Sequence, residues 1–199
     1  MPWLYLLLNR MKSRMSITER NRLYNVSFSL NFVVQFSIVA RKMNGINEHE
    51  KYMAQALREA RKAARIGEIP IGAVIVKDGS IVGRGYNRVE SGKDPTLHAE
   101  MIAIRRAASK LGVWRLIGCT MYVTVEPCSM CAGAAVLARL GAVVAGAKSD
   151  KSGACGSVKD ILDSDSLNHR VDYMAGVLEQ DCAALLGVFF KGLRERRSE

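Results

Sequence analysis

Two short motifs in this sequence contain residue types that bind a transition metal. The first is His98-Ala99-Glu100, and the second is Pro127-Cys128-Ser129-Met130-Cys131. Imidazole nitrogen and thiolate sulfur are ligands that Zn²⁺ prefers, and two cysteines separated by two residues can hold one ion at the start of a helix. We therefore predict that His98, Cys128 and Cys131 bind one Zn²⁺ ion per chain.

The number of ligands distinguishes a catalytic zinc site from a structural one. The sequence has three histidines and one C-x-x-C pattern, so a fourth ligand is not evident. Structural sites are normally closed by four protein ligands, whereas catalytic sites leave one position for water. Zinc lowers the pKa of that water to roughly 7, and Glu100 is close enough in sequence to shuttle its proton. Alone, the C-x-x-C pattern also fits a redox pair or a structural half-site; the two motifs together favour catalysis.

The apolar pattern predicts an α/β framework around these motifs. Met53, Leu57, Ala60 and Ala64 recur at helical spacing, and Gly67 ends that helix. We predict strands over residues 71–77, 81–86, 120–125 and 142–147, and further helices over about 98–111 and 129–140 and from about 178 into the basic C-terminus. The helix that contains Glu100 is expected to present Met101, Ile104 and Ala108. Helices that alternate with strands indicate a sheet covered by helices.

The net charge of +10 is distributed unevenly along the chain. Residues 1–47 contain seven basic residues and one acidic residue, whereas residues 48–199 contain 22 basic and 18 acidic residues. We therefore separate a basic N-terminal extension, 1–47, from a catalytic domain, 48–199. The extension has the basic, acid-poor composition of an organelle transit peptide, but translation that starts at Met43 explains it equally simply, and we favour that interpretation. Either way, we expect the extension to be disordered or absent from the working protein.

The composition also indicates in which cellular compartment the protein works. The five cysteines are odd in number and include the C-x-x-C pair, which favours metal binding in a reducing compartment over disulfide bonds. Polar residues interrupt the apolar stretches of the extension, so a membrane-spanning helix is not expected. We expect a cytoplasmic protein, with organelle targeting by the extension left open. The basic balance suits a polyanionic partner.

At the two motifs the chain resembles the cytidine deaminase-like zinc deaminases, whose signature is H-x-E followed by P-C-x-x-C. From about Glu48 to Arg197 it is similar, within that group, to the bacterial tRNA adenosine deaminases. The similar segments are Glu68–Val74, Gly85–Arg88, Asp94–Thr96, Trp114–Leu116, Lys151–Ser157, Leu167–Val171 and Cys182–Leu186 with Phe189-Phe190. Many of these relatives have an aspartate where Ser149 stands.

This resemblance implies a three-layer α/β/α fold with a mixed five-strand sheet, and a homodimer. It implies hydrolysis of adenosine to inosine at the wobble position of a tRNA anticodon, with Glu100 as the proton shuttle. The resemblance further implies that Asn87 binds the flipped nucleoside, that Ile69, Val74 and Val125 form apolar walls near the base, and that Lys148, Lys151, Arg170 and the terminal cluster 191–197 contact tRNA phosphates.

Two other functions stay open from the sequence. The shared signature also occurs in deaminases of free guanine or cytosine, which an assay with free bases would reveal. A protein of a different class, a non-catalytic zinc module that binds RNA, would hold the metal and lack activity. The basic tail and the Asn168–Val171 stretch favour the tRNA enzyme.

Overall fold

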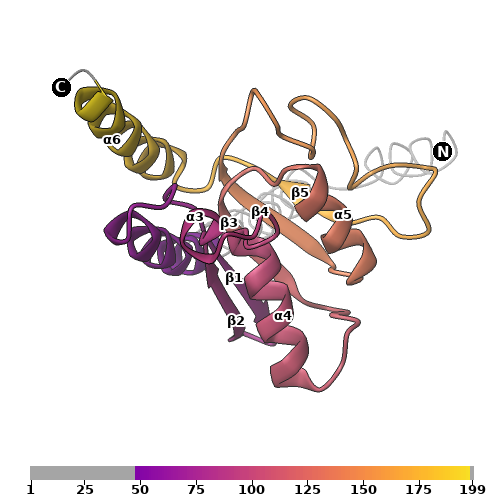
Figure 1. Cartoon of the computed structure of the whole chain (residues 1–199). Coiled ribbons are helices and arrows are strands. Elements are labelled where there is room, and N and C mark those ends of the chain that lie inside the picture. Colours follow the sequence, from indigo (N-terminus) through magenta and orange to yellow (C-terminus); the bar gives the residue numbers. More distant parts are fainter. Residues whose placement is uncertain (1–47, 198–199) are drawn as a thin grey trace, which may run out of the picture. The chain divides into compact units, whose positions relative to one another are not determined.

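The computed structural model describes residues 48–197, so the predicted extension, 1–47, and both interpretations of it lie outside the described residues. A five-stranded sheet with the order β2-β1-β3-β4-β5 forms the centre (Figure 1). Its strands are β1 (Gly72–Lys77), β2 (Ser80–Tyr86), β3 (Thr120–Val125), β4 (Ala142–Ala147) and β5 (Asp172–Met174). β1 is antiparallel to β2 and β3, whereas β3, β4 and β5 are parallel. The predicted mixed sheet is confirmed.

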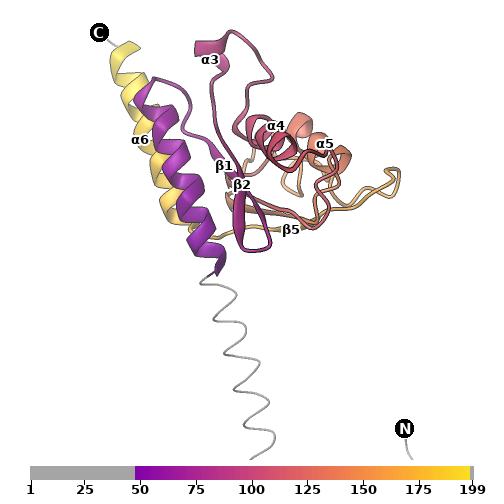
Figure 2. The ribbon, with the colours of Figure 1, turned by 90° about the horizontal axis from the view of Figure 1, so that it is seen from below.

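Helices cover both faces of this sheet. They are α3 (Val89–Gly92), α4 (Ala99–Leu111), α5 (Ser129–Leu137), α6 (Glu179–Arg197) and a helix over residues 48–65. Figure 2 shows the helix over 48–65 and α6 side by side on one face, with α4 and α5 on the other. The expected three-layer arrangement is therefore present. Within residues 48–197, no helix has the length and apolar content needed to cross a membrane.

Alternating side chains of the central strands fill two separate cores. Ala73 and Ile75 of β1 belong to the cluster under α4 and α5. Val74 and Val76 belong to the cluster under the helix over residues 48–65, together with Cys182 of α6. This alternation follows from the pleat of a strand, which sends successive side chains to opposite faces. The metal-binding motifs lie at the starts of α4 and α5, on the face that these two helices cover.

Small residues bring α4 against the sheet. The alanines Ala99, Ala103 and Ala107 are fully buried, and β-carbons added to Gly83 and Gly85 of β2 would lie 2.3 Å and 2.1 Å from carbonyl oxygens of α4. Because these glycines have no side chain, the alanine face reaches the strand backbone. The face predicted from Met101, Ile104 and Ala108 is instead only partly buried. This close contact fixes the start of α4, which carries His98 and Glu100.

Other differences from the predicted elements are local. α5 ends at Leu137, three residues earlier than predicted, and Arg139 adopts a left-handed φ of 57° after it. The pattern did not locate β5 and α3, which have three and four residues. Segments this short carry too few residues to show a period.

Gly72 offers a test of the packing on the opposite face. Its added β-carbon would lie 2.2 Å from the carbonyl oxygen of Ala56 and 2.3 Å from the amide nitrogen of Ala60, both backbone atoms of the helix over residues 48–65. We expect Gly72→Ala to lower the free energy of unfolding by about 3 kcal/mol, because a backbone cannot move aside as a flexible side chain can. Urea denaturation followed by circular dichroism measures this change.

A glycine of α6 provides the matched control. Nothing lies within 4 Å of a β-carbon added to Gly187. Because alanine favours a helix over glycine, Gly187→Ala should stabilise the chain by up to about 1 kcal/mol. Equal stability of the Gly72→Ala variant and the wild type would contradict the close contact.

Candidate metal centre

Each metal-binding motif lies where a helix begins, as predicted. His98 has extended φ and ψ angles of −68° and 152° and directly precedes α4. Cys128 has angles of −75° and 174° and directly precedes α5. Helix N-termini carry unpaired N–H groups and a positive dipole end, which favour thiolate over thiol. Because α4 and α5 lie on the same face of the sheet, the two motifs meet (Figure 1).

The three predicted ligands lie within reach of a single ion. Nδ1 of His98 is 3.7 Å from Sγ of Cys128 and 3.5 Å from Sγ of Cys131. All three candidate ligand atoms lie within 4.8 Å of one another, and among residues 48–197 no fourth ligand joins this group. Two ligands at ordinary Zn–S and Zn–N distances in a tetrahedral site are separated by about 3.6 Å. The group therefore fits one zinc ion with three protein ligands.

The protonation of the two thiols shows why this group suits a cation. The Cys131 S–H and the His98 N–H donate hydrogen bonds to the sulfur of Cys128 and lower the pKa of Cys128 to about 3. The neighbouring Cys128 sulfur and burial raise the pKa of Cys131. The two sulfurs thus compete for a proton, which a bound metal ion would displace.

Glu100 lies beside the ligands with one carboxylate oxygen unused. Its side chain is only 3% exposed, and Oε2 is buried with no hydrogen-bond partner among the described residues. Burial raises the pKa of Glu100. An unpaired buried carboxylate oxygen is costly unless a further group binds it. Oε2 therefore identifies the place where a water or a substrate proton would be held.

Asn87 is oriented by a second buried glutamate. Nδ2 of Asn87 donates to Oε2 of Glu68 at 3.3 Å, and the backbone N–H of Ser91 donates to Oε1 of Glu68 at 2.7 Å. Asn87 is 5% exposed and Glu68 is 1% exposed. Because Glu68 occupies the amide nitrogen, the amide oxygen of Asn87 remains to accept a hydrogen bond from a ligand. Sequence reasoning gave Glu68 no role.

The three predicted apolar wall residues differ in position. Ile69 is 39% exposed and follows Glu68 directly. Val125 is partly exposed at the end of β3, three residues before Cys128. Val74, in contrast, is fully buried in the cluster under the helix over residues 48–65. That cluster lies on the face of the sheet away from α4 and α5, so Val74 acts as a core residue and has no surface to offer a base.

The predicted phosphate contacts also differ from one another. Lys148 and Lys151 are exposed in the segment that follows β4. Arg170 is exposed as well, but it forms ion pairs with Asp163, at 3.2 Å, and with Asp165. Its charge is thus largely balanced by its own loop. The structure brings Arg170 to these two carboxylates rather than to an open basic surface.

The Asn168–Val171 stretch is bound to the end of α5. Nη1 of Arg139 donates to the carbonyl oxygen of Asn168 at 2.7 Å, and Nε2 of His169 lies 2.8 Å from the carbonyl oxygen of Leu140. These hydrogen bonds satisfy backbone groups near the helix end. This stretch therefore anchors the loop before β5.

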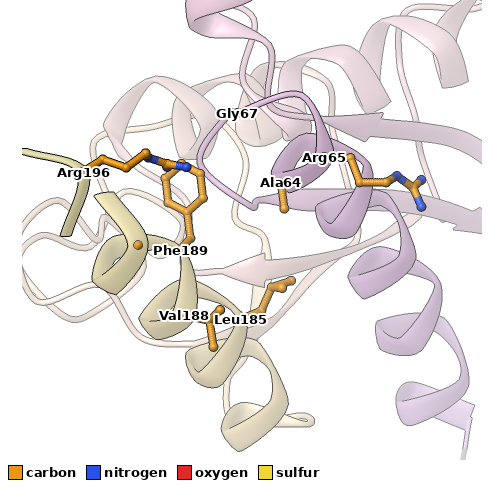
Figure 3. A pocket seen from close by; sticks show the side chains of 8 residues that line it. Ala64, Arg65, Gly67, Leu185, Val188, Phe189 and Arg196 are labelled. Atoms are coloured by element: carbon orange, nitrogen blue, oxygen red, sulfur yellow. The ribbon is translucent and has the colours of Figure 1, made fainter. Parts of the chain in front are cut away.

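A hollow of about 380 Å³ lies between the helix over residues 48–65 and α6. Leu185, Val188 and Phe189 supply its apolar lining from α6. Figure 3 shows Arg65 and Arg196, which come from the two different helices, at its two sides. In Figure 3 the Phe189 ring lies beside Arg196, and the guanidinium of Arg65 is directed away from the ring. Basic side chains together with aromatic rings are features of surfaces that bind single-stranded nucleic acid.

Glu126 is a second buried glutamate without a role in the sequence interpretation. It is 4% exposed and directly precedes Pro127 and Cys128. Burial by itself would raise its pKa, but a hydrogen bond from the Ser157 hydroxyl and three from backbone N–H groups outweigh burial and lower the pKa of Glu126. Glu126 is therefore ionised. The only signal in the sequence was its place beside a ligand.

Comparison with known proteins agrees with this site. Residues 46–147 match the family described as the cytidine and deoxycytidylate deaminase zinc-binding region. The tRNA-specific adenosine deaminase of Bacillus subtilis (strain 168) is 45% identical over 152 residues, which cover 76% of this chain and 94% of that protein. A structure from a study of A-to-I editing by tRNA:A34 deaminases at the wobble position of transfer RNA has a TM-score of 0.66 and 41% identity, covering 68% of this chain and 99% of that chain.

A guanine deaminase from Nitrosomonas europaea shares the fold at lower identity. Its TM-score is 0.62 at 25% identity, and the match covers 70% of this chain and 83% of that one. The identity to the tRNA enzymes is therefore clearly higher than the identity to this free-base enzyme. This chain belongs to the cytidine and deoxycytidylate deaminase zinc-binding family, among the tRNA-specific adenosine deaminases.

Proposed function

We propose that this chain hydrolyses adenosine to inosine at the wobble position of a tRNA anticodon and releases ammonia. The buried, unpaired Oε2 of Glu100 beside a three-ligand metal group is the observation that carries this proposal. The similarity to tRNA-specific adenosine deaminases supplies the substrate. We place the reaction in the cytoplasm, because the cysteines of the described chain are free, as suits a reducing compartment, and the similar enzymes are bacterial tRNA-specific deaminases.

The chemistry follows from what each group can hold. When bound, zinc makes hydroxide available near neutral pH. Glu100 would carry two protons in turn. Oε2 would take the first from the attacking water and deliver it to a ring nitrogen of the purine, and would then take the second from the hydroxyl newly bonded to the purine carbon and deliver it to the amino group, which leaves as ammonia. Burial raises the pKa of the Glu100 carboxyl group. A raised pKa suits both steps, since the group must gain and lose a proton in each of them. The cost of extruding the base is small, because bases in an anticodon loop are already partly unstacked.

Recognition of the nucleoside and of the RNA involves different parts of the surface. The amide oxygen of Asn87 would accept a hydrogen bond from the flipped nucleoside, between apolar walls formed by Ile69 and Val125. Lys148 and Lys151 would contact phosphates beside the site. The hollow between Arg65 and Arg196 would hold a flanking part of the strand (Figure 3).

The substrate class is tested with one RNA and a panel of small molecules. The RNA is an anticodon stem-loop with adenosine at the wobble position, and the same stem-loop with guanosine there is its control. We expect inosine by mass spectrometry, ammonia in equal amount, and weaker binding as salt rises. Conversion of free guanine or cytosine with the RNA unchanged would assign a small-molecule deaminase. No conversion of any substrate by a chain with one bound zinc would assign a binding module.

We further propose that two chains pair through the outer face of α5. This helix contains no charged residue, and Leu137 on it is 71% exposed. Met130, Gly133 and Ala134 are only partly buried by the rest of the described chain. A helix that is apolar on all sides is normally covered on all sides. A second copy of the chain supplies that cover.

Leu137→Asp tests this pairing. A carboxylate in an apolar interface loses its hydration, so we expect the variant to shift from dimer to monomer in light scattering coupled to size-exclusion chromatography. Val188→Asp on α6 is the control, because Val188 is similarly exposed, at 74%. A Leu137→Asp dimer as stable as that of the wild type would exclude this face.

A further inference from the structure

Glu126 uses both carboxylate oxygens to hold one loop. Oε1 accepts hydrogen bonds from the backbone N–H groups of Cys155, at 3.0 Å, and Ser157, at 3.1 Å. Oε2 accepts from the backbone N–H of Ser149, at 3.1 Å, and from the hydroxyl of Ser157. These four hydrogen bonds reach from residue 149 to residue 157. One buried side chain thus ties the two ends of the segment together.

The same loop is joined to the metal-binding loop through the backbone. Cys128 forms an isolated β-bridge with Gly153, and the N–H of Ala154 donates to the carbonyl oxygen of Pro127 at 2.9 Å. A β-carbon added to Gly153 would lie 2.5 Å from the Glu126 carboxylate. No side chain fits between the two loops. Glu126 and these backbone contacts together set the distance between them.

The loop over residues 148–159 carries cations that lie close to a metal ligand. Lys148, Lys151 and Lys159 are exposed on it. A hollow of about 310 Å³ is lined by Cys128 and Ser129 on the metal side and by Lys151 and Lys159 on the loop side. A displacement of the loop would separate these lysines from the ligand Cys128.

We propose that Glu126 is a positioning residue, which fixes the lysine-bearing loop 148–159 against the metal-binding loop and so aligns the RNA backbone with the reacting base. This inference rests on the proposed RNA substrate. It assigns Glu126 to RNA binding rather than to proton transfer. Glutamate is needed because four donors face it, and a carboxylate has lone pairs for all four.

Glu126→Gln tests this role. Glutamine has one acceptor oxygen, and its NH₂ group opposes the N–H donors that face it. Two weakened hydrogen bonds to a buried charge predict a rise in KM for the stem-loop of about tenfold or more, with kcat within about threefold of wild type and one zinc per chain retained. Removal of a negative charge beside a polyanion site would by electrostatics alone lower KM. We expect the opposite change for Glu126→Gln, a rise in KM.

Asp150→Asn is the matched control, because Asp150 is exposed in the same loop and makes none of these four hydrogen bonds. Its KM should stay equal or fall. A double-mutant cycle with Lys151→Ala gives the decisive readout. If Glu126 acts through the lysines, Glu126→Gln should raise KM far less in the Lys151→Ala background than in wild type. Equal increases in both backgrounds would overturn the inference.

A second variant covers the case in which Glu126→Gln does not fold. Ser157→Ala removes one donor and keeps the carboxylate, so it should raise KM in the same direction by a smaller factor, and Ser157→Thr should restore binding. An unchanged KM in Ser157→Ala or Glu126→Gln overturns the inference while the wild-type enzyme still edits RNA. Failure of the wild type to edit RNA refutes the proposed function instead.

Discussion

Glu100→Gln is expected to reduce the rate of RNA deamination by about 10³-fold or more, within the range that general acid–base catalysis contributes to enzymes. The substitution preserves size and removes the ability to take up and release a proton. Because Glu100 lies outside the group of three ligand atoms, the variant should keep one zinc per chain. Single-turnover conversion of the anticodon stem-loop, together with metal analysis of the same sample, measures both effects.

A buried glutamate elsewhere in the fold provides the control. Glu59 is 2% exposed and pairs with Lys62 and Arg84, on the face of the sheet away from the metal group. Glu59→Gln should lower stability and leave the rate of deamination near that of wild type. If Glu100→Gln retained zinc and turned over within tenfold of wild type, another group would have to move the proton.

The metal group was predictable because its chemistry is contained in the residue types. His98, Cys128 and Cys131 are the ligands that zinc selects, and both motifs were placed at helix starts by the apolar periodicity alone. The order of strands and helices then brings the two starts to one face of the sheet. α4 comes after β2 and α5 comes after β3, and both strands are antiparallel to β1. β2 and β3 therefore run in the same direction and end at the same edge of the sheet, where both helices begin.

The packing of α4 shows what the sequence could not reveal. A helix by itself suggests that its largest apolar residues face the core, which selected Met101 and Ile104. The structure buries the alanine face most deeply, because Gly83 and Gly85 of β2 allow backbone contact there, while Ile104 and Ala108 are partly buried against the same core. The same limit applies to Val74, whose face depends on which helices cover the sheet. Which face of α4 is buried, and which face of the sheet Val74 occupies, depends on contacts with residues distant in the sequence.

The roles of Glu68 and Glu126 depend on hydrogen bonds between residues far apart in the sequence. Ser91 lies 23 residues from Glu68, and Ser157 lies 31 residues from Glu126. A buried glutamate without a visible partner in the sequence is indistinguishable from an exposed one. Arg170 is the reverse case, since the two aspartates that balance its charge occur within the same loop.

Cys131→Ala is expected to lower the zinc affinity of the chain by more than about 100-fold, because loss of a direct ligand should exceed the effect of losing a group that only orients one. Activity should fall in parallel with zinc content. Competition against a coloured chelator measures the affinity. Substitution by Co²⁺ gives an independent readout, since charge-transfer bands from sulfur report the number of bound thiolates and should weaken when one of the two is removed.

Cys119→Ala separates loss of a ligand from loss of a buried thiol. Cys119 is fully buried in the cluster under α4 and α5, and it does not belong to the metal-binding group. Its replacement should cost some stability through a small cavity and leave zinc affinity and the Co²⁺ spectrum unchanged. Full zinc occupancy of Cys131→Ala under chelator, with both sulfur bands intact, would mean that another thiol fills the position. In that case the open site on which Glu100 acts would have to be built from different ligands.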